Sequence, residues 1–167
     1  KRYGNAHAQV VPYEVFAVAD GHIILAIGND GQFRRFCEVA GCAALADDER
    51  FRTNSARIVN RAALIPQVAE VMRTRPKKEW IALLEAATVP CGPINNMKEV
   101  FEDPQVQHRD LRVDIPHPLG GTAPVVRSPM RLSETPVDYR IAPPLLGQHT
   151  DEVLKGLLDR KSTRLNS

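Results

Sequence analysis

Cysteine is the strongest nucleophile in the sequence, and it occurs as Cys37, Cys42 and Cys91. These residues show no CxxC spacing and no histidine pair lies near them, so neither a zinc site nor a disulfide framework is predicted. Cys37 lies within an apolar helical pattern, which favours a buried small side chain over a nucleophile. We therefore expect reduced thiols, as is usual in the cytoplasm.

A glycine-containing turn and several histidines are further candidates for a site. The turn Gly28-Asn29-Asp30-Gly31 has the composition of a phosphate cradle, but it lacks GxGxxG spacing and the Lys-Ser/Thr pair of a P-loop. We interpret it as a turn and helix cap. His108, His117 and His149 fall on expected loops without an i, i+4 pair, so they are interpreted as surface or capping residues and no metal site is predicted.

The formal net charge of +2 comes entirely from residues 159–167, where Arg160, Lys161 and Arg164 outnumber Asp159. This segment reads as one translation frame of a sequencing adapter, and we expect it to be non-native; the alternative is a disordered basic tail. Without it the chain is neutral, so no nucleic-acid partner is expected.

The apolar fraction of 43% is enough to bury one core. No apolar run approaches the roughly 20 residues that span a bilayer, so we expect a soluble, cytoplasmic protein without a membrane partner. The chain opens at Lys1 without an initiator methionine or a signal sequence, and we expect it to begin inside a longer protein.

Strands and a helix are predicted first along the chain. Residues 13–27 alternate and then become apolar around an Asp20-Gly21 turn, which predicts a β-hairpin. Apolar positions from Phe33 to Ala40 recur at helical spacing, with Asn29 or Asp30 as the cap and Gly41 just beyond the end. This order indicates an α+β fold.

The middle of the chain is predicted to be helical, with two apolar stripes on either side of Thr74-Arg75-Pro76. The stripes consist of Leu64, Val68, Val71 and Met72, and of Trp80, Leu83, Leu84 and Ala87. Pro66 fits the first helix if it occupies the first turn, which we expect from a start near Arg61 or Ala62.

The last third of the chain is richer in proline and glycine. Residues 90–94 must be extended or turned, and a short helix follows until Asp103-Pro104. A second hairpin is predicted around Gly120-Gly121. Beyond Ser128 we expect an extended arm, and then a helix over 151–158 with Thr150 as its N-cap.

Several motifs, taken in order, are similar to those of the family III CoA-transferases of the CaiB/BaiF type. They are Gly4-Asn5-Ala6-His7, Val11-Pro12-Tyr13, Asp20-Gly21, Gly28-Asn29-Asp30, Gln32-Phe33, Thr53-Asn54 with Arg57, Glu79-Trp80, Val89-Pro90-Cys91-Gly92-Pro93, Asp103-Pro104-Gln105, Ser128-Pro129, and Pro144-Leu145-Leu146-Gly147-Gln148-His149-Thr150. The similarity runs from Arg2 to about Leu157 and corresponds to the carboxyl-terminal portion of such a subunit.

The resemblance implies a small α+β domain, an antiparallel sheet with flanking helices, followed by an extended arm and a C-terminal helix. We assign residues 1–12 to an active-site loop and linker, 13–127 to the small domain, 128–158 to the arm and helix that return to a large domain, and 159–167 to the tail. The apolar edge of the last helix, Val153, Leu154 and Leu157, is expected to dock onto that absent domain. The whole subunits are expected to form an interlaced homodimer.

The resemblance also implies an activity, the transfer of CoA between an acyl-CoA and a carboxylic acid. In such enzymes an aspartate of the amino-terminal half attacks the thioester and forms an acyl-aspartyl anhydride. No motif around Asp20, Asp30, Asp47 or Asp103 matches its context, so this chain is expected to carry no catalytic nucleophile and to be inactive alone. CoA is expected as substrate and product, with no covalently bound cofactor and no metal.

The segment Gly4 to Gln9 matches the place of the family's glycine-rich loop, which covers the acyl-aspartyl intermediate. The expected substrate-loop residues are Gly4, Asn5, Ala6, His7 and Gln9. A lid protects a mixed anhydride from water, and its amides can stabilise an oxyanion. His7 can donate to a substrate carboxylate, carry a proton, or simply order the loop.

Three alternatives stay open at this point. Members of the same fold include 2-methylacyl-CoA racemases, which abstract an α-proton. A noncatalytic ligand-binding or interaction domain is the second. For four arginines, Arg50, Arg52, Arg57 and Arg61, the choice lies between the CoA phosphates, a solvated face and a dimer contact.

Overall fold

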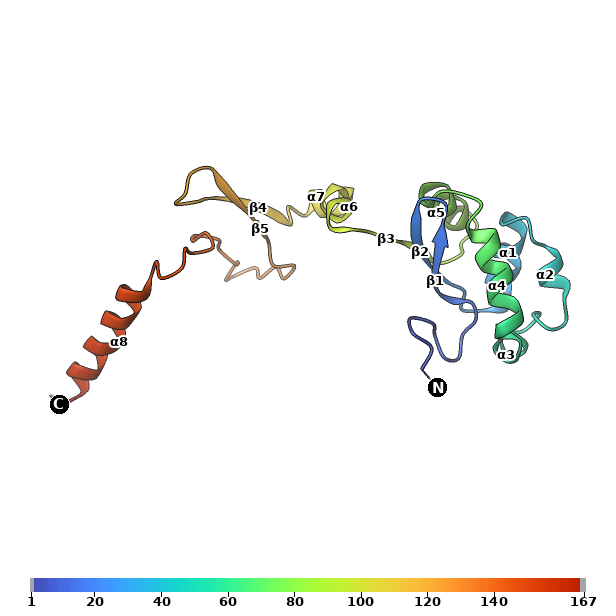
Figure 1. Cartoon of the computed structure of the whole chain (residues 1–167), viewed down its shortest axis with the longest axis horizontal. Helices are drawn as coiled ribbons and strands as arrows, with labels where there is room; N and C mark the ends of the chain where they lie inside the picture. The colour runs from blue at the N-terminus through green and yellow to red at the C-terminus, as the bar shows by residue number, and fades with distance from the viewer. Residues whose placement is uncertain (1, 166–167) are drawn as a thin grey trace. The chain divides into compact units, whose positions relative to one another are not determined.

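The structure is a computed structural model that describes residues 2–165, with side chains up to residue 158 (Figure 1). It contains two compact units, Lys1–Asn96 (unit 1) and Met97–Ser167 (unit 2). The boundary between them falls inside the 13–127 segment that the sequence assigns to one small domain. The four segments predicted from the sequence stay a prediction for the whole protein.

Unit 1 contains a three-stranded antiparallel sheet in the order β1-β2-β3. The strands are β1 (Tyr13–Val18), β2 (Gly21–Ala26) and β3 (Cys91–Ile94). Val18 pairs with Gly21, so the predicted hairpin is confirmed with a two-residue connection. The extended conformation predicted for residues 90–94 is also confirmed, but its pairing with β2 was not predicted.

Five helices of unit 1 lie between β2 and β3 in the chain. They are α1 (Asp30–Val39), α2 (Ala44–Asp47), α3 (Asn54–Val59), α4 (Arg61–Met72) and α5 (Lys77–Ala86). The turn at Gly28 does cap a helix, because the Asn29 side chain accepts a hydrogen bond from the Gln32 amide. Gly41 lies just past the end of α1 with φ +72°, the left-handed conformation that glycine adopts without strain.

The core of unit 1 lies between one face of its sheet and helices α1, α4 and α5. Register places Phe16 opposite Ile23, and both side chains are buried together with Val18 and Leu25. The helices contribute Phe33, Phe36, Cys37, Leu64, Val68, Met72, Trp80 and Leu84. The two predicted apolar stripes therefore do form this core, and Trp80 also donates its Nε1–H to the Met72 carbonyl oxygen at 2.7 Å.

The position predicted for Pro66 is wrong. Helix α4 does begin at Arg61, but Pro66 lies five residues later and therefore inside the helix. Because proline has no amide hydrogen, the Ala62 carbonyl loses its i+4 donor. The side chain of Pro66 is exposed and lines a surface groove.

Unit 2 consists of two short helices, one hairpin, an extended arm and a last helix. Its elements are α6 (Met97–Glu102), α7 (Pro104–His108), β4 (Arg112–Pro116), β5 (Thr122–Val126) and α8 (Thr150–Leu165). The second predicted hairpin is confirmed, with Ile115 opposite Ala123 and positive φ at both Gly120 and Gly121. Together the antiparallel sheets and flanking helices give the α+β class that the sequence predicts.

Helix α8 differs from the prediction at both ends. It begins at Thr150 itself, since the Val153 amide already donates to the His149 carbonyl, so Thr150 is not the N-cap. It continues to Leu165, past the predicted end at 158, because no proline or glycine follows Gly156 to interrupt it. Within residues 2–165, no helix combines the length and apolar character needed to span a bilayer.

Candidate functional site

The predicted substrate loop begins with a tight turn. The Ala6 amide donates to the Tyr3 carbonyl at 3.1 Å, and Gly4 has φ +64°. Gly4 is the loop's single glycine, and it stands where the backbone must be left-handed. Gly4 therefore provides the left-handed backbone of the turn, and residues 5–9 of the loop all have a side chain.

The loop then runs beside strand β1 and contacts it at two places. The His7 amide donates to the Tyr13 carbonyl at 2.8 Å, and the Val15 amide donates to the Asn5 side-chain oxygen at 3.0 Å. The His7 ring stacks on the Tyr13 ring with centroids 5.4 Å apart. Two of the predicted loop residues, Asn5 and His7, thus fasten the loop to the sheet.

His7 orders the loop through its own ring as well. Its Nδ1 accepts a hydrogen bond from the Gln9 amide at 3.1 Å. Because Nδ1 is an acceptor, the neutral ring carries its proton on Nε2. The loop-ordering role considered for His7 is therefore present, and Nε2–H remains a donor.

Three side chains of helices α3 and α4 bind the backbone of the loop and its exit. Arg61 Nη2 donates to the carbonyl oxygens of His7 at 2.7 Å and Ala8 at 3.1 Å. Asn54 donates to the Gln9 carbonyl at 2.9 Å and accepts from the Val11 amide at 3.1 Å. Arg57 Nε donates to the Val11 carbonyl at 2.6 Å.

Arg57 is fully buried, which is unusual for an arginine. Its guanidinium also donates to the Phe51 carbonyl at 2.9 Å, pairs with the Asp30 carboxylate at 2.9 Å, and lies over the Phe33 ring. Burial lowers the pKa of Arg57, and the hydrogen bond and charge of Asp30 oppose that change. The helix-capping turn at 28–31 is therefore connected to the loop exit through one cation.

These contacts bear on the roles considered for the four arginines. Arg57 cannot belong to a solvated face, because it has no exposed surface. The Arg61 guanidinium binds loop carbonyls, and Arg50 forms an ion pair with Asp48 at 2.7 Å. Arg52 is exposed. A direct role in phosphate binding is thus not needed to explain Arg50, Arg57 or Arg61.

A groove of about 570 Å³ opens beside the loop. Its lining combines two loop-side residues with β1, α3 and α4: Tyr3, Ala6, Glu14, Ile58, Val59, Arg61, Ala62, Ile65 and Pro66. Glu14 is its one carboxyl group, and burial raises the pKa of Glu14 although the Arg61 charge opposes this. Sequence analysis missed Glu14, since the alternation of β1 shows only that it shares a face with Phe16 and Val18.

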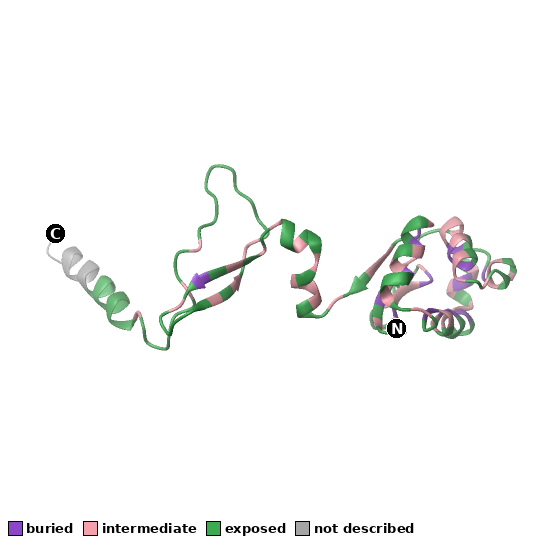
Figure 2. Cartoon of the chain, turned by 90° about the horizontal axis from the view of Figure 1, so that it is seen from above, coloured by how far each residue is buried: buried purple, intermediate pink, exposed green. Residues whose placement is uncertain are grey.

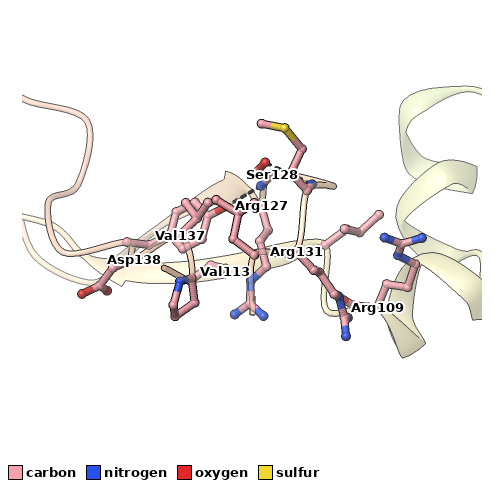
Figure 3. Close-up of a pocket in the computed structure, with 12 residues that line it drawn as sticks. Arg109, Val113, Arg127, Ser128, Arg131, Val137 and Asp138 are labelled. Atoms are coloured by element: carbon pink, nitrogen blue, oxygen red, sulfur yellow. Dashed lines mark hydrogen bonds between the residues drawn. The ribbon is translucent and has the colours of Figure 1, made fainter. Parts of the chain in front are cut away.

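A second groove lies wholly within unit 2, between the hairpin and the start of the arm. Arg109, Arg127 and Arg131 line it, and Figure 3 shows Asp138 at one end and Arg109 at the other. Among the described residues none of these three arginines forms an ion pair, whereas Asp138 pairs with Arg140. The groove therefore carries a local excess of positive charge that the neutral composition of the chain does not reveal.

The three cysteines of unit 1 lie in or beside its core. Cys37 is buried, as predicted, and its thiol contacts Cys42, whose sulfur accepts its hydrogen bond; this contact and burial raise the pKa of Cys37. All three cysteines are free thiols. Across residues 2–165, no three His, Cys, Asp or Glu side chains come together as a metal site.

Comparison with known proteins identifies the family of the chain. The family model described as CoA-transferase family III matches residues 1–150. The chain belongs to CoA-transferase family III. This agrees with the resemblance drawn from the ordered motifs, since the matched range includes the loop, the hairpin, the helices and the arm.

Among curated proteins, the chain is similar to the succinate–glutarate CoA-transferase of Agrobacterium fabrum, at 44% identity over 164 residues. It is also similar to the human succinyl-CoA:glutarate CoA-transferase, at 40% identity over 158 residues. These matches cover 97% and 95% of this chain but 41% and 36% of the two relatives. The chain thus spans about 40% of the length of the relatives that it matches.

Among solved structures, a CAIB/BAIF family protein from Brucella suis superposes with a TM-score of 0.81 at 39% identity. The match covers 94% of this chain and 40% of that protein.

Proposed function

We propose that this chain is the loop-bearing part of an enzyme that transfers CoA between an acyl-CoA and a carboxylic acid, with dicarboxylates as the favoured acids. The observation that carries the proposal is the 44% identity, over 97% of the chain, to a relative named succinate–glutarate CoA-transferase. Acyl-CoA and free acid would be the substrates, and CoA would be bound without any covalent cofactor.

In the proposed reaction, an aspartate outside this chain attacks the thioester carbonyl and expels the CoA thiolate, which leaves an acyl-aspartyl anhydride. The thiolate then attacks the aspartyl carbonyl and releases the first acid. The second acid attacks the resulting aspartyl-CoA thioester, expels the CoA thiolate and forms a second acyl-aspartyl anhydride. The thiolate finally attacks the acyl carbonyl of this anhydride, which gives the new acyl-CoA and frees the aspartate. Each carbonyl attack develops negative charge on an oxygen, which preorganised N–H groups stabilise.

The part proposed for this chain is to cover that intermediate with the loop Gly4 to Gln9. A mixed anhydride is hydrolysed by water, so a loop held over it protects the transfer. The backbone contacts of Arg61 and Asn54 support a loop with a defined shape. The His7 Nε2–H is a donor suited to the distal carboxylate of a dicarboxylate acyl group.

The transferase reading is preferred over a 2-methylacyl-CoA racemase and over a noncatalytic binding domain. The similar proteins of human and Agrobacterium both carry names of CoA-transferases. We further propose that the whole subunits act as a cytoplasmic homodimer and that the 167 residues alone are inactive.

A chimera tests the proposed function. The part of the Agrobacterium enzyme that the match does not cover is joined to this chain, and succinyl-CoA-dependent formation of glutaryl-CoA is measured. We expect turnover by the chimera and none by the chain alone. Turnover by the isolated chain, or a folded chimera inactive with every short dicarboxylate while the parent enzyme is active, would overturn the proposal.

A further inference from the structure

Arg61 fixes the direction of one peptide unit of the loop. In a trans peptide the C=O and the N–H point in opposite directions, and the only cis bond among the described residues is Val11–Pro12. Arg61 binds the His7 carbonyl at 2.7 Å, and the Ala8 amide belongs to the same peptide unit. The Ala8 N–H therefore points away from the guanidinium.

Asn54 fixes a second peptide unit in the same way. It binds the Gln9 carbonyl at 2.9 Å, so the Val10 N–H of that unit points away from the amide of Asn54. Between these two units, the Gln9 N–H is occupied by the His7 ring. The amide of Ala8 in the loop and that of Val10 just after it are thus directed away from the helices, whose side chains hold the His7 and Gln9 carbonyls of the same peptide units.

Neither of these two amides has a hydrogen-bond partner within residues 2–165, whereas the neighbouring Gln9 and Val11 amides each have one. Ala8 is exposed and Val10 is half-buried. An amide is also a stronger donor when a cation polarises the carbonyl of its own peptide unit. Arg61 supplies that cation to the Ala8 amide.

The position of Arg61 in its helix supports a role toward the loop. Arg61 is the first residue of α4, where a cation opposes the helix dipole and costs up to about 1 kcal/mol. Its contacts lie instead with the loop, including the Tyr3 ring at 4.7 Å. The loop thus gains two carbonyl contacts from an arginine whose position the helix dipole disfavours.

We propose that Arg61 and Asn54 are positioning residues that aim the Ala8 and Val10 N–H groups at an acyl oxygen of the substrate. The inference rests on the proposed function for the identity of that oxygen, a thioester or anhydride carbonyl. The orientation of the amides rests only on the contacts of unit 1.

The ordering of these two amides by Arg61 and Asn54 is tested on the 167-residue chain by ¹⁵N relaxation of its backbone amides. We expect order parameters near the rigid value of about 0.85 for Ala8 and Val10. Arg61→Ala should lower the value of Ala8 below about 0.6, and Asn54→Ala should do the same for Val10, while β2 amides stay rigid. Arg52→Ala removes a nearby exposed arginine and should change neither.

Unchanged order parameters at Ala8 in Arg61→Ala and at Val10 in Asn54→Ala would overturn the inference. If Arg61→Ala loses the dispersed signals of β2, Arg61→Lys carries the test instead. Lysine keeps the charge of arginine but not its fork geometry. An Ala8 order parameter in Arg61→Lys between the parent value and about 0.6 therefore supports the inference, and a value equal to that of the parent protein contradicts it.

The chimera adds a kinetic measurement that separates this inference from the proposed function. Arg61→Ala should lower kcat about 10-fold to 100-fold with little change in KM, and Arg61→Lys should restore part of it. Equal kcat in Arg61→Ala and its parent would contradict the inference although the chimera is a transferase. An inactive chimera whose loop still loosens in Arg61→Ala would instead refute the function and leave the positioning role intact.

Discussion

The two units of the chain bury very different shares of their apolar residues. Figure 2 shows the buried residues concentrated in unit 1. Among the residues whose burial the structure describes, all but one of the buried apolar side chains belong to unit 1, and the exception in unit 2 is Ile115. Among the large apolar side chains that are exposed, unit 1 contributes Tyr3, Val59 and Ile94. Unit 2 contributes Met97, Leu119, Val126, Met130, Leu132, Val137, Ile141, Leu145, Leu146, Val153, Leu154, Leu157 and Leu158.

The local pattern of a sequence can thus specify helices and strands without forming a hydrophobic core. Unit 1 has a sheet face covered by helices, which is a complete arrangement for burying apolar surface. Over its described residues, unit 2 has a single two-stranded hairpin, which is marginally stable in water by itself. Val153, Leu154 and Leu157 are exposed within the described residues, and their docking onto a further domain stays a prediction.

Hydrogen exchange measures the difference in stability between the sheets of the two units. Amides in the centre of β2 should exchange at least about 1,000-fold more slowly than those of β4 and β5, because only β2 is covered by a core. Exchange followed by mass spectrometry of the intact chain measures both. Equal protection of the two sheets would show that unit 2 is stabilised by contacts other than its own apolar packing.

A single substitution should show how much of unit 1 depends on one buried cation. Arg57→Met leaves the carbonyls of Val11 and Phe51 without donors, and we expect it to lower the free energy of unfolding by about 3–5 kcal/mol. Urea unfolding followed by the fluorescence of Trp80, the single tryptophan, reports on this unit. The control Arg52→Ala should stay within about 0.5 kcal/mol of the parent.

Thiol reactivity tests how closed the interior of unit 1 is. The hydrogen bond from Cys37 lowers the pKa of Cys42, whereas burial raises the pKa of Cys91. Iodoacetamide should therefore modify Cys42 at least about 10-fold faster than Cys37 or Cys91, as read by peptide mass spectrometry. Similar rates should appear only in denaturant, and similar rates in the native protein would contradict the burial of Cys37.

The smallest expected effect concerns Glu14 in the groove beside the loop. Burial raises the pKa of Glu14 above its ordinary 4.5. Below pH 4.5 the carboxyl group is protonated in both the folded and the unfolded state, so it does not change the stability. As the pH rises from 4.5 through the folded-state pKa, the ionised form lowers the stability of the folded state. Glu14→Gln should stabilise unit 1 at pH 7 by a few tenths of a kcal/mol and leave it unchanged at pH 3.5. Urea unfolding at both pH values measures this, and stabilisation at pH 3.5 alone would contradict the sign.

Local signals predicted most of the elements correctly. The Asp20-Gly21 turn between apolar runs, the Asn29 cap and the Gly41 terminus all depend on residues within a few positions of one another. The error at Pro66 instead has a tertiary origin. Pro66 was expected in the first turn, but the packing of Leu64 and Val68 on either side of it keeps the helix intact around the proline.

The contacts that define the site could not be predicted in the same way. Arg61 reaches the carbonyl of His7, and Asn54 reaches that of Gln9, across more than forty intervening residues. A sequence pattern shows that arginines gather at 50–61, but it does not show whether they face solvent, a phosphate or the chain itself. The pairing of β3 with β2 is equally distant, and residues 91–94 gave only the signal of an extended segment.

The contact between the loop and β1 has a consequence for the solubility of the protein. β1 is an outer strand of its sheet, and its free side presents the Tyr13 carbonyl and the Val15 amide, groups on which a strand of another molecule could pair. His7 and Asn5 occupy both groups. The segment proposed to shield a reactive intermediate thus also guards an open sheet edge. Any change that frees the loop for a bulkier substrate would therefore increase the risk of edge-to-edge aggregation.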